Sequence, residues 1–281
     1  ERQMSTFTAY LRKERMESSR QSKYLILGAF FGFFALSTPI MLRIMPSIIE
    51  SQMPGFPQEL MKFDAVYSVQ NYIKSIYQLG NMAVAFVLMG VLADERLQGK
   101  LVYPVSQGAS MTGVVGAKLI HYGAAVSVIV LASTMLNFYY SVVLFPGSDP
   151  GLVAAARSAG LLAAYFATRV VIVVFASALF TKPLAAGLAA LVVSYVEPII
   201  ASLPHWKSLV AYSLIDLASN SLGTGMGAVP GTGGMMAAGR TGSEASGWVL
   251  AAALAVEVAA MALAAIWRMK SVEIAPGAGA Q

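Results

Sequence analysis

The stretch SAGLLAAYFATRVVIVVFASALFT, residues 158–181, contains a single charged residue, Arg169. About 20 apolar residues in a helix cross the roughly 30 Å hydrocarbon core of a bilayer, so this stretch is long enough to span a membrane. Further runs of this kind lie at 24–42, 75–93, 119–145, 184–203 and 248–267. Backbone groups cannot stay unpaired in lipid, and the short alternating segments of a transmembrane barrel are absent from the sequence. We therefore predict an all-α, polytopic membrane protein with six transmembrane helices.

The composition of the 281-residue chain agrees with this prediction. Hydrophobic residues make up 57% of it and charged residues 12%, and the mean hydropathy is +0.67, whereas soluble domains carry about 25% charged residues. Cysteine is absent, which excludes disulfides and thiolate metal sites, and His121 and His205 are too few for a histidine-rich site. We expect a multi-pass protein of the cell membrane that holds no metal.

The basic residues indicate the orientation. If the N-terminus is cytoplasmic, the inner segments contain the twelve residues Arg2, Arg12, Lys13, Arg15, Arg20, Lys23, Arg96, Lys100, Lys118, Lys182, Arg268 and Lys270. The outer segments then contain the six residues Arg43, Lys62, Lys74, Arg157, Lys207 and Arg240. The positive-inside rule therefore predicts that both termini are cytoplasmic. This topology explains the net charge of +5 without a nucleic-acid partner.

The polar connections differ in character. Residues 94–118 are predicted to form the first cytoplasmic loop, in which SQGASMTGVVGAK, residues 106–118, forms a short helix across the membrane face; the alternative is a plain solvated connector. The outer segment 43–71 is expected to form one or two short helices on the outer face. The Gly-rich outer region within 204–247 is expected to be either a flexible connector or a substrate gate.

Two polar segments carry motif residues. In the first inner loop these are, in order, Glu95, Gly99, Leu101, Pro104, Val105, Ser106 and Lys118. Before the first span, YLRKERMESSRQSKYLI contains the pair Lys13 and Glu14. Both motifs resemble those of the permease subunits of ABC-2 type ATP-binding-cassette transporters. Lys100 departs from the family pattern, in which Thr is usual, and this departure leaves the substrate open.

The resemblance implies that residues 1–281 form a single ABC-2 type transmembrane domain with an interfacial helix at 4–23. It implies two permease chains, identical or related, and two separate ATPase subunits that bind ATP and Mg and press on a coupling helix in the first inner loop. The implied coupling residues are Glu95, Gly99, Leu101, Pro104, Ser106, Gly108, Ser110, Gly113 and Lys118. The implied interfacial residues are Arg12, Lys13, Glu14, Arg15 and Arg20, whose cationic face is expected to meet anionic lipid head groups or the ATPase.

The chain itself shows no nucleotide-binding motif. Gly108 and Gly113 have the spacing of a P-loop, but Val114 and Val115 follow where Lys and Ser or Thr are required. We therefore expect a transport subunit, an exporter by family majority, that is not an enzyme and holds no cofactor of its own.

Three charged residues fall within the predicted spans: Arg169, Glu197 and Glu257. Each costs about 2.5–3.5 kcal/mol at the bilayer centre, so they are expected to face one another or a water-filled path. Arg169 and Glu197 lie at similar distances from the turn at 181–183 and hence at similar depths. We predict that Arg169 pairs with Glu197 or Glu257, either to hold the helices in register or as part of a polar lining that contacts substrate or protons.

Two other functions remain open. A proton-coupled secondary transporter would use Arg169, Glu197 and Glu257 as a relay, although no inverted repeat is evident. An intramembrane serine protease would use Ser110 and His121, but Met111 stands where a glycine is expected after the serine.

Overall fold

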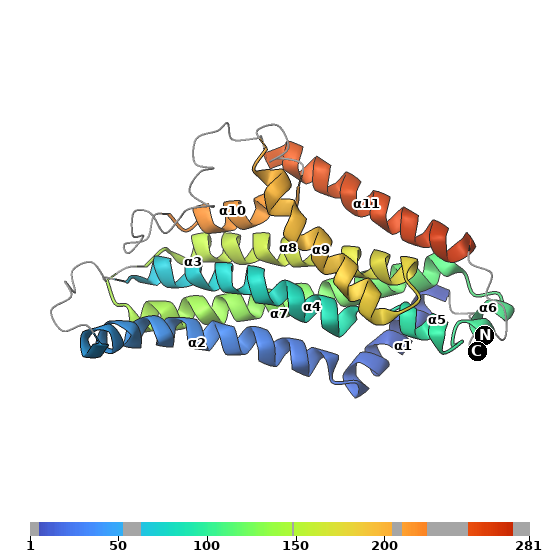
Figure 1. The fold of residues 1–281 in the computed structure, drawn as a ribbon, viewed down its shortest axis with the longest axis horizontal. Helices are drawn as coiled ribbons and strands as arrows, with labels where there is room; N and C mark the ends of the chain where they lie inside the picture. The colour runs from blue at the N-terminus through green and yellow to red at the C-terminus, as the bar shows by residue number, and fades with distance from the viewer. Residues whose placement is uncertain (1–5, 53–62, 148, 204–209, 224–246, 272–281) are drawn as a thin grey trace.

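The computed structural model describes residues 6–52, 63–147, 149–203, 210–223 and 247–271. The regular secondary structure of these residues is entirely helical (Figure 1). Six of the helices are long and apolar enough to cross a membrane: Lys23–Gln52, Ala65–Leu97, Met111–Leu144, Leu152–Leu179, Pro183–Ala201 and Val249–Ser271. The predicted all-α class and the six candidate spans are therefore confirmed, and the protein belongs to the class of multi-pass membrane proteins.

The N-terminal helix α1 (Thr6–Arg20) is followed by a turn and then by α2 (Lys23–Gln52). Ser22 in the turn has a φ of 56°, a left-handed conformation that changes the direction of the chain within two residues. Figure 1 shows α1 at an angle to α2, at the end of the bundle where α5 (Ala93–Leu97) and α6 (Val102–Ser106) also lie. We call this end of the molecule the α1 end.

The second span consists of α3 (Ala65–Ser75), the π-helical turn η2 (Ile76–Gly80) and α4 (Asn81–Leu88), and it leads into α5. Asp64 caps α3, because its side chain accepts a hydrogen bond from the N–H of Tyr67 at 2.7 Å. A Cβ at Gly80 would lie 2.9 Å from the ring of Phe166 and 3.1 Å from that of Phe31. The missing side chain of Gly80 therefore lets the second span approach α2 and α8 closely.

The helices α7 (Met111–Leu144) and α8 (Leu152–Leu179) pack along each other in the bundle. They are followed by α9 (Pro183–Ala201), α10 (Ser213–Asn220) and α11 (Gly247–Ser271). In the most apolar window of α8, 67% of the residues are buried, against 11% in α11, which lies along the outside of the bundle (Figure 1). Polar side chains of α8 must therefore be satisfied by other protein groups.

Most of the spans extend further than the apolar runs predict. The first continues past Leu42 to Gln52 and the sixth past 267 to Ser271, while the second begins at Ala65 instead of 75, the third at Met111 instead of 119 and the fourth at Leu152 instead of 158. Separate short helices were predicted in 43–71. In the parts of this segment that the structure describes the prediction is wrong, because residues 43–52 continue α2 and residues 65–71 begin α3. Polar residues beyond the hydrocarbon core are solvated or meet protein partners, so a helix does not stop where the apolar run stops.

The prediction of a short helix at 106–118 is also wrong. The short helix is α6 (Val102–Ser106), and residues 111–118 are the first two turns of α7. Ser110 caps α7 by accepting a hydrogen bond from the N–H of Gly113 at 3.2 Å. Within 204–247, residues 210–223 are described and include α10, while the Gly-rich part beyond 223 lies outside the described residues.

Candidate functional site

Helix α1 packs against the first turns of α7, and this contact depends on Gly113. A Cβ at Gly113 would lie 3.0 Å from the Cβ of Thr6 and 3.1 Å from the main-chain nitrogen of Phe7. The resemblance implied that Gly113 is one of the coupling residues. In the structure the place beside Gly113 is occupied by α1 of the same chain.

Four charged side chains from α1, α5 and α7 form what we call the α1–α5–α7 ion cluster: Lys13, Glu14, Glu95 and Lys118. Lys118 Nζ lies 2.6 Å from Glu14 Oε1 and 3.1 Å from Glu95 Oε2. Lys13 Nζ donates a hydrogen bond to Glu95 Oε1. Glu14, Glu95 and Lys118 are each no more than 5% exposed. Buried charges of this kind are tolerated only when they are paired, so the cluster joins three segments that are distant in sequence.

Hydroxyl groups extend the cluster toward α2. Tyr122 donates from its OH to Glu14 Oε2 at 2.9 Å. The same hydroxyl accepts hydrogen bonds from Ser18 Oγ at 3.2 Å and from Lys23 Nζ at 3.3 Å. The ends of α1, α2 and α7 are therefore held together by one network of charged and polar groups.

Helix α5 is also attached to α8 on its other side. Ser177 Oγ accepts hydrogen bonds from the N–H groups of Leu92 and Ala93 at 2.9 and 2.8 Å. Arg96 Nη1 donates to the carbonyl of Ala178 at 2.7 Å, which satisfies one of the unpaired carbonyls at the end of α8. Through α5 the ion cluster is connected to the most buried helix of the bundle.

The pairing also affects how the residues of α1 ionise. Burial by itself would raise the pKa of Glu14, but Lys118, Tyr122 and Lys13 together outweigh it, so the pKa of Glu14 lies below its ordinary value. Burial likewise opposes the charged form of Lys13, but the hydrogen bond to Glu95 and the charges of Glu95, Glu14 and Glu17 together outweigh it and raise the pKa of Lys13. Both residues are therefore ionised at neutral pH.

Acidification is expected to detach α1. A carboxyl with a lowered pKa in the folded state adds stability above its unfolded pKa of about 4.3, and this stability is lost as the pH falls through the lower folded value. Lys13 adds stability that is complete below its unfolded pKa of about 10.4 and is lost only as the pH rises through its higher folded value. Protease cleavage at the turn after α1 should increase below about pH 4. It should not change between pH 6 and 9, and an equal rate at all these values would contradict the prediction.

A small polar cavity of about 60 Å³ lies beside the cluster, lined by residues that include Glu17, Lys23 and Asp94. A buried water needs about 10–15 Å³ of such space, so the cavity has room for a few waters. Ligand pockets typically measure about 300–1,000 Å³. The cavity is therefore too small to be a site for an organic substrate.

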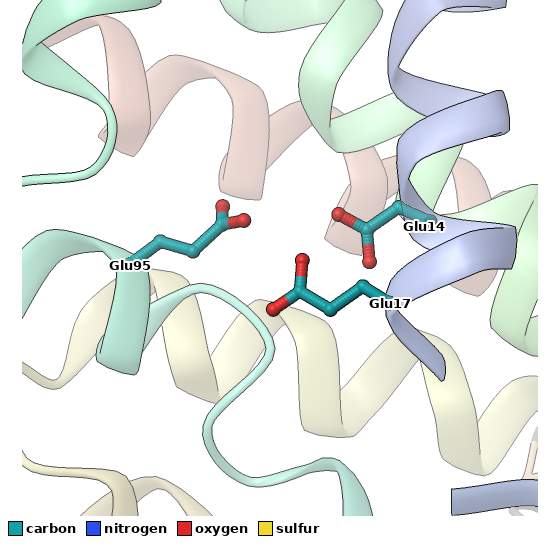
Figure 2. Close-up of side chains that lie close together, drawn as sticks. All are labelled: Glu14, Glu17 and Glu95. Carbon is teal, nitrogen blue, oxygen red and sulfur yellow. The ribbon is translucent and has the colours of Figure 1, made fainter. Parts of the chain in front are cut away.

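Three carboxylates converge at this place, as Figure 2 shows for Glu14 and Glu17 on α1 and Glu95 on α5. One oxygen from each lies within 4.8 Å of the others, a spacing that a cation could bridge. The ammonium groups of Lys13 and Lys118 already contact oxygens of this group, and Lys13 Nζ also lies 3.5 Å from Glu17 Oε2. The lysines thus provide the positive charge that a metal ion would otherwise bring.

The coupling residues implied by the resemblance fall into two groups. Glu95, Leu101 and Lys118 are buried and hold the loop in place. Ser106, Gly108 and Ser110 are exposed and lie outside the ion cluster, as does Gly99, while Pro104 is half-buried. Gly99 and Gly108 have φ values of 64° and 83°, a conformation that favours glycine, and they form the turns on either side of α6. The two glycines therefore shape the loop.

The interfacial residues that the resemblance implied on α1 also fall into two groups. Lys13 and Glu14 point into the ion cluster, whereas Arg12, Arg15 and Arg20 are exposed. The predicted cationic face of α1 is thus available at the surface of the molecule.

The charged residues within the spans form a second cluster. Arg169 Nη2 lies 2.6 Å from Glu197 Oε1 and donates to Glu197 Oε2 at 2.7 Å. This ion pair is one of the two that the sequence predicted for Arg169. Arg169 Nη1 donates to Ser194 Oγ at 3.3 Å, and the guanidinium lies 4.6 Å from the centre of the Tyr165 ring. Arg169 is only 2% exposed. Glu257 is not bonded to this pair, and its Oε2 is buried without a hydrogen-bond partner.

The structure does not bring together the residues of a serine protease. Ser110 Oγ caps α7, whereas the His121 ring contacts Ser18 and Tyr24. Eleven residues of helix, about 16 Å, separate Ser110 from His121 along α7. Nothing in this arrangement activates Ser110 as a nucleophile.

Replacing Gly113 by valine is expected to displace α1. The new side chain would meet the backbone of α1 at about 3 Å, and backbone cannot move aside as a flexible side chain can. The Gly116→Val variant is the matched control, since a Cβ at Gly116 meets only Phe7 at 3.9 Å. Thermal unfolding in detergent should show a lower midpoint for Gly113→Val than for Gly116→Val. Equal midpoints would show that the contact does not constrain α1.

Neither the protein-family models nor the curated proteins with which we compared the chain give a match.

Most of the groups that complete the two clusters belong to no sequence motif and were not predicted. Tyr122, Ser177 and Ser194 each satisfy a buried charge or backbone group, and Ser18 donates a hydrogen bond to the hydroxyl of Tyr122. A helical periodicity could have found two of them. Ser18 follows Glu14 by four residues, and Tyr122 follows Lys118 by four, so each pair lies on one face of its helix.

Proposed function

We propose that the chain is the permease subunit of an ABC-2 type transporter, which forms a path across the cell membrane and is driven by separate ATPase subunits. The observation that carries the proposal is the α1–α5–α7 ion cluster. Lys13, Glu14, Glu95 and Lys118 come from the two motifs that resemble this family, and in the structure all four belong to one ion network, in which Glu14, Glu95 and Lys118 are buried and Lys13 is half-buried. A shared structural role of this kind supports the resemblance more than either motif does alone.

In this proposal both termini and the α1 end are cytoplasmic. The ATPase would contact α6, where Tyr103 is 73% exposed and Ser106 and Gly108 are also exposed. A push on α6 would move α5, because Leu101 is buried beneath the loop and Glu95 is held by two lysines. Helices α1, α7 and α8 would follow α5, and these helices lead into the membrane-spanning bundle.

The partners follow from the same proposal. Two ATPase subunits would bind ATP and Mg and hydrolyse the nucleotide, and this chain would supply no nucleotide site of its own. A second copy of the chain or a related permease would complete the path, and the direction would be export. The exposed Arg12, Arg15 and Arg20 would meet anionic lipid head groups at the inner face.

A photo-crosslinking experiment tests the proposal in native membranes. A photoreactive amino acid at Tyr103 should crosslink to a chain that mass spectrometry identifies as an ATP-binding-cassette ATPase. The matched control is Val153, which is 84% exposed at the start of α8, at the end of the bundle away from α6 (Figure 1). Tyr103 crosslinks that contain no ATPase, or equal ATPase crosslinking from both positions, would overturn the proposal.

A proton-coupled secondary transporter is the second candidate, and the cluster of Arg169, Glu197 and Glu257 favours it. The purified chain in vesicles distinguishes the two candidates. Transport driven by a pH gradient without any ATPase subunit would support the second candidate, and transport that requires the ATPase and ATP would support the first.

A further inference from the structure

The pair formed by Arg169 and Glu197 has an unmatched neighbour. Glu257 on α11 lies within electrostatic range of both residues. The group therefore contains one guanidinium and two carboxyl groups in the apolar part of the bundle. If all three were ionised, one negative charge would remain uncompensated where the dielectric is low, which is unfavourable.

The hydrogen bonds decide which carboxyl group keeps its charge. Glu197 Oε2 accepts a hydrogen bond from Arg169 Nη2 at 2.7 Å, and Glu197 also receives one from the main-chain N–H of Tyr212. Glu197 Oε1 lies 2.6 Å from the same nitrogen as an ion pair but accepts no hydrogen bond. Glu257 Oε2 is buried and has no hydrogen-bond partner. A carboxylate without donors is far less stable in an apolar place than a neutral carboxylic acid.

No other described charge balances Glu257. Helix α11 packs against α8 and α7. From α8 the group is faced by Arg169, with the Tyr165 ring beside it, and from α9 by Glu197. Two groups of ionisable side chains lie on α7. The network around α1 contains Lys118, His121 and Tyr122. The last two turns of the helix contain Tyr139 and Tyr140. On α11 itself, Arg268 and Lys270 lie in the last turn.

We propose that Arg169, Glu197 and Glu257 form a proton-binding site in which one exchangeable proton resides on Glu257. Arg169 Nε also lacks a hydrogen-bond partner, so the guanidinium has a free donor with which to bind a second carboxylate. When Glu257 loses its proton, its carboxylate can take up this donor. Protonation of Glu257 thereby controls whether α8 is bound electrostatically to α9 alone or to α9 and α11 together. The site exists whether or not the chain is driven by an ATPase.

The position of α11 makes the proton accessible from the membrane. Helix α11 lies along the outside of the bundle (Figure 1), and its neighbouring side chain Val256 is 68% exposed. A lipophilic carbodiimide, which modifies protonated carboxyl groups in apolar surroundings, is therefore the appropriate probe. We expect it to modify Glu257 of the full chain in nanodiscs at pH 7 and to leave Glu197 unmodified.

The Glu197→Gln variant gives the sharpest test. It removes a carboxyl group other than the labelled one, and it leaves Arg169 with Glu257 as its only carboxylate partner among the described residues. Glu257 should then give up its proton, and its rate of modification should fall by about tenfold or more, because an adjacent opposite charge changes proton affinity by that much. The Glu257→Gln variant should show no modification at this site.

The other outcomes overturn the proposal. Equal modification of Glu257 in the wild type and in Glu197→Gln would show that Arg169 does not govern the proton. Modification at pH 5 but not at pH 7 would show that Glu257 has already lost its proton at neutral pH. Absence of modification at both values would contradict the accessible, protonated carboxyl group that the proposal requires.

Discussion

Lys118→Met is expected to lower the free energy of unfolding by about 3–5 kcal/mol, the range found when one partner of a buried ion pair is removed. Lys118 is 1% exposed, and its ammonium contacts both Glu14 and Glu95. Without it, Glu14 keeps only the hydroxyl of Tyr122 and the more distant Lys13, at 3.7 Å, as stabilising partners. The midpoint of thermal unfolding in detergent measures the effect.

The double variant Glu14→Gln with Lys118→Met separates the charge from the packing. It removes the unpaired carboxylate and leaves Glu95 with Lys13, so it should unfold at a higher temperature than Lys118→Met alone. Lys74→Met is the matched control, because Lys74 is exposed and such surface substitutions change stability by less than about 0.5 kcal/mol. If the double variant were less stable than the single one, the buried carboxylate would not be the cause.

Release of α1 is the second readout of Lys118→Met. The turn at Ser22 is the hinge by which α1 would leave α7. Protease cleavage at this turn should be faster in Lys118→Met than in Lys74→Met. Unchanged cleavage together with lowered stability would place the damage within the bundle and not at α1.

Arg169→Met is expected to destabilise the protein by a similar amount, about 3–5 kcal/mol. It leaves the Glu197 carboxylate in the apolar bundle without its cation, and it removes the contact between the guanidinium and the Tyr165 ring. The double variant Arg169→Met with Glu197→Gln should recover part of the loss, because its remaining carboxyl group can be protonated.

The control for this series lies on the same helix. Arg157 is exposed on α8, so Arg157→Met removes the same charge from the same element without leaving a buried carboxylate. Its thermal midpoint should stay close to that of the wild type. Equal losses for Arg169→Met and Arg157→Met would show that burial of the ion pair does not matter for stability.

The pairing of Arg169 with one of two carboxylates, Glu197 or Glu257, could be predicted from sequence because the membrane restricts the alternatives. A charge within an apolar run must find a partner at the same depth, and the short turn at 181–183 makes the two helices antiparallel neighbours. Depth along two helices follows from residue numbers alone. The same reasoning could not choose between Glu197 and Glu257, since it contains no information on which helix faces point toward each other.

The partners within the α1–α5–α7 ion cluster could not be predicted. Lys13, Glu14, Glu95 and Lys118 lie in polar segments near the ends of the spans, where water is as good a partner as another side chain. Hydropathy therefore gives no signal for their burial. For the same reason the sequence predicts a loop where the first turns of α7 lie. In the structure Lys118 is buried in these turns against Glu14.

By itself the sequence determined the all-α class, the six candidate spans and the depth of the charges within them, because a helix in lipid must be apolar over a fixed length and must pair its charges. Only the tertiary structure decided that α1 lies on Gly113, that α5 joins α1 and α7 to α8, and that Glu257 Oε2 is left without a hydrogen-bond partner. Contacts of this kind join segments about one hundred residues apart in the sequence. No local pattern of residues encodes which of the compatible side chains meet.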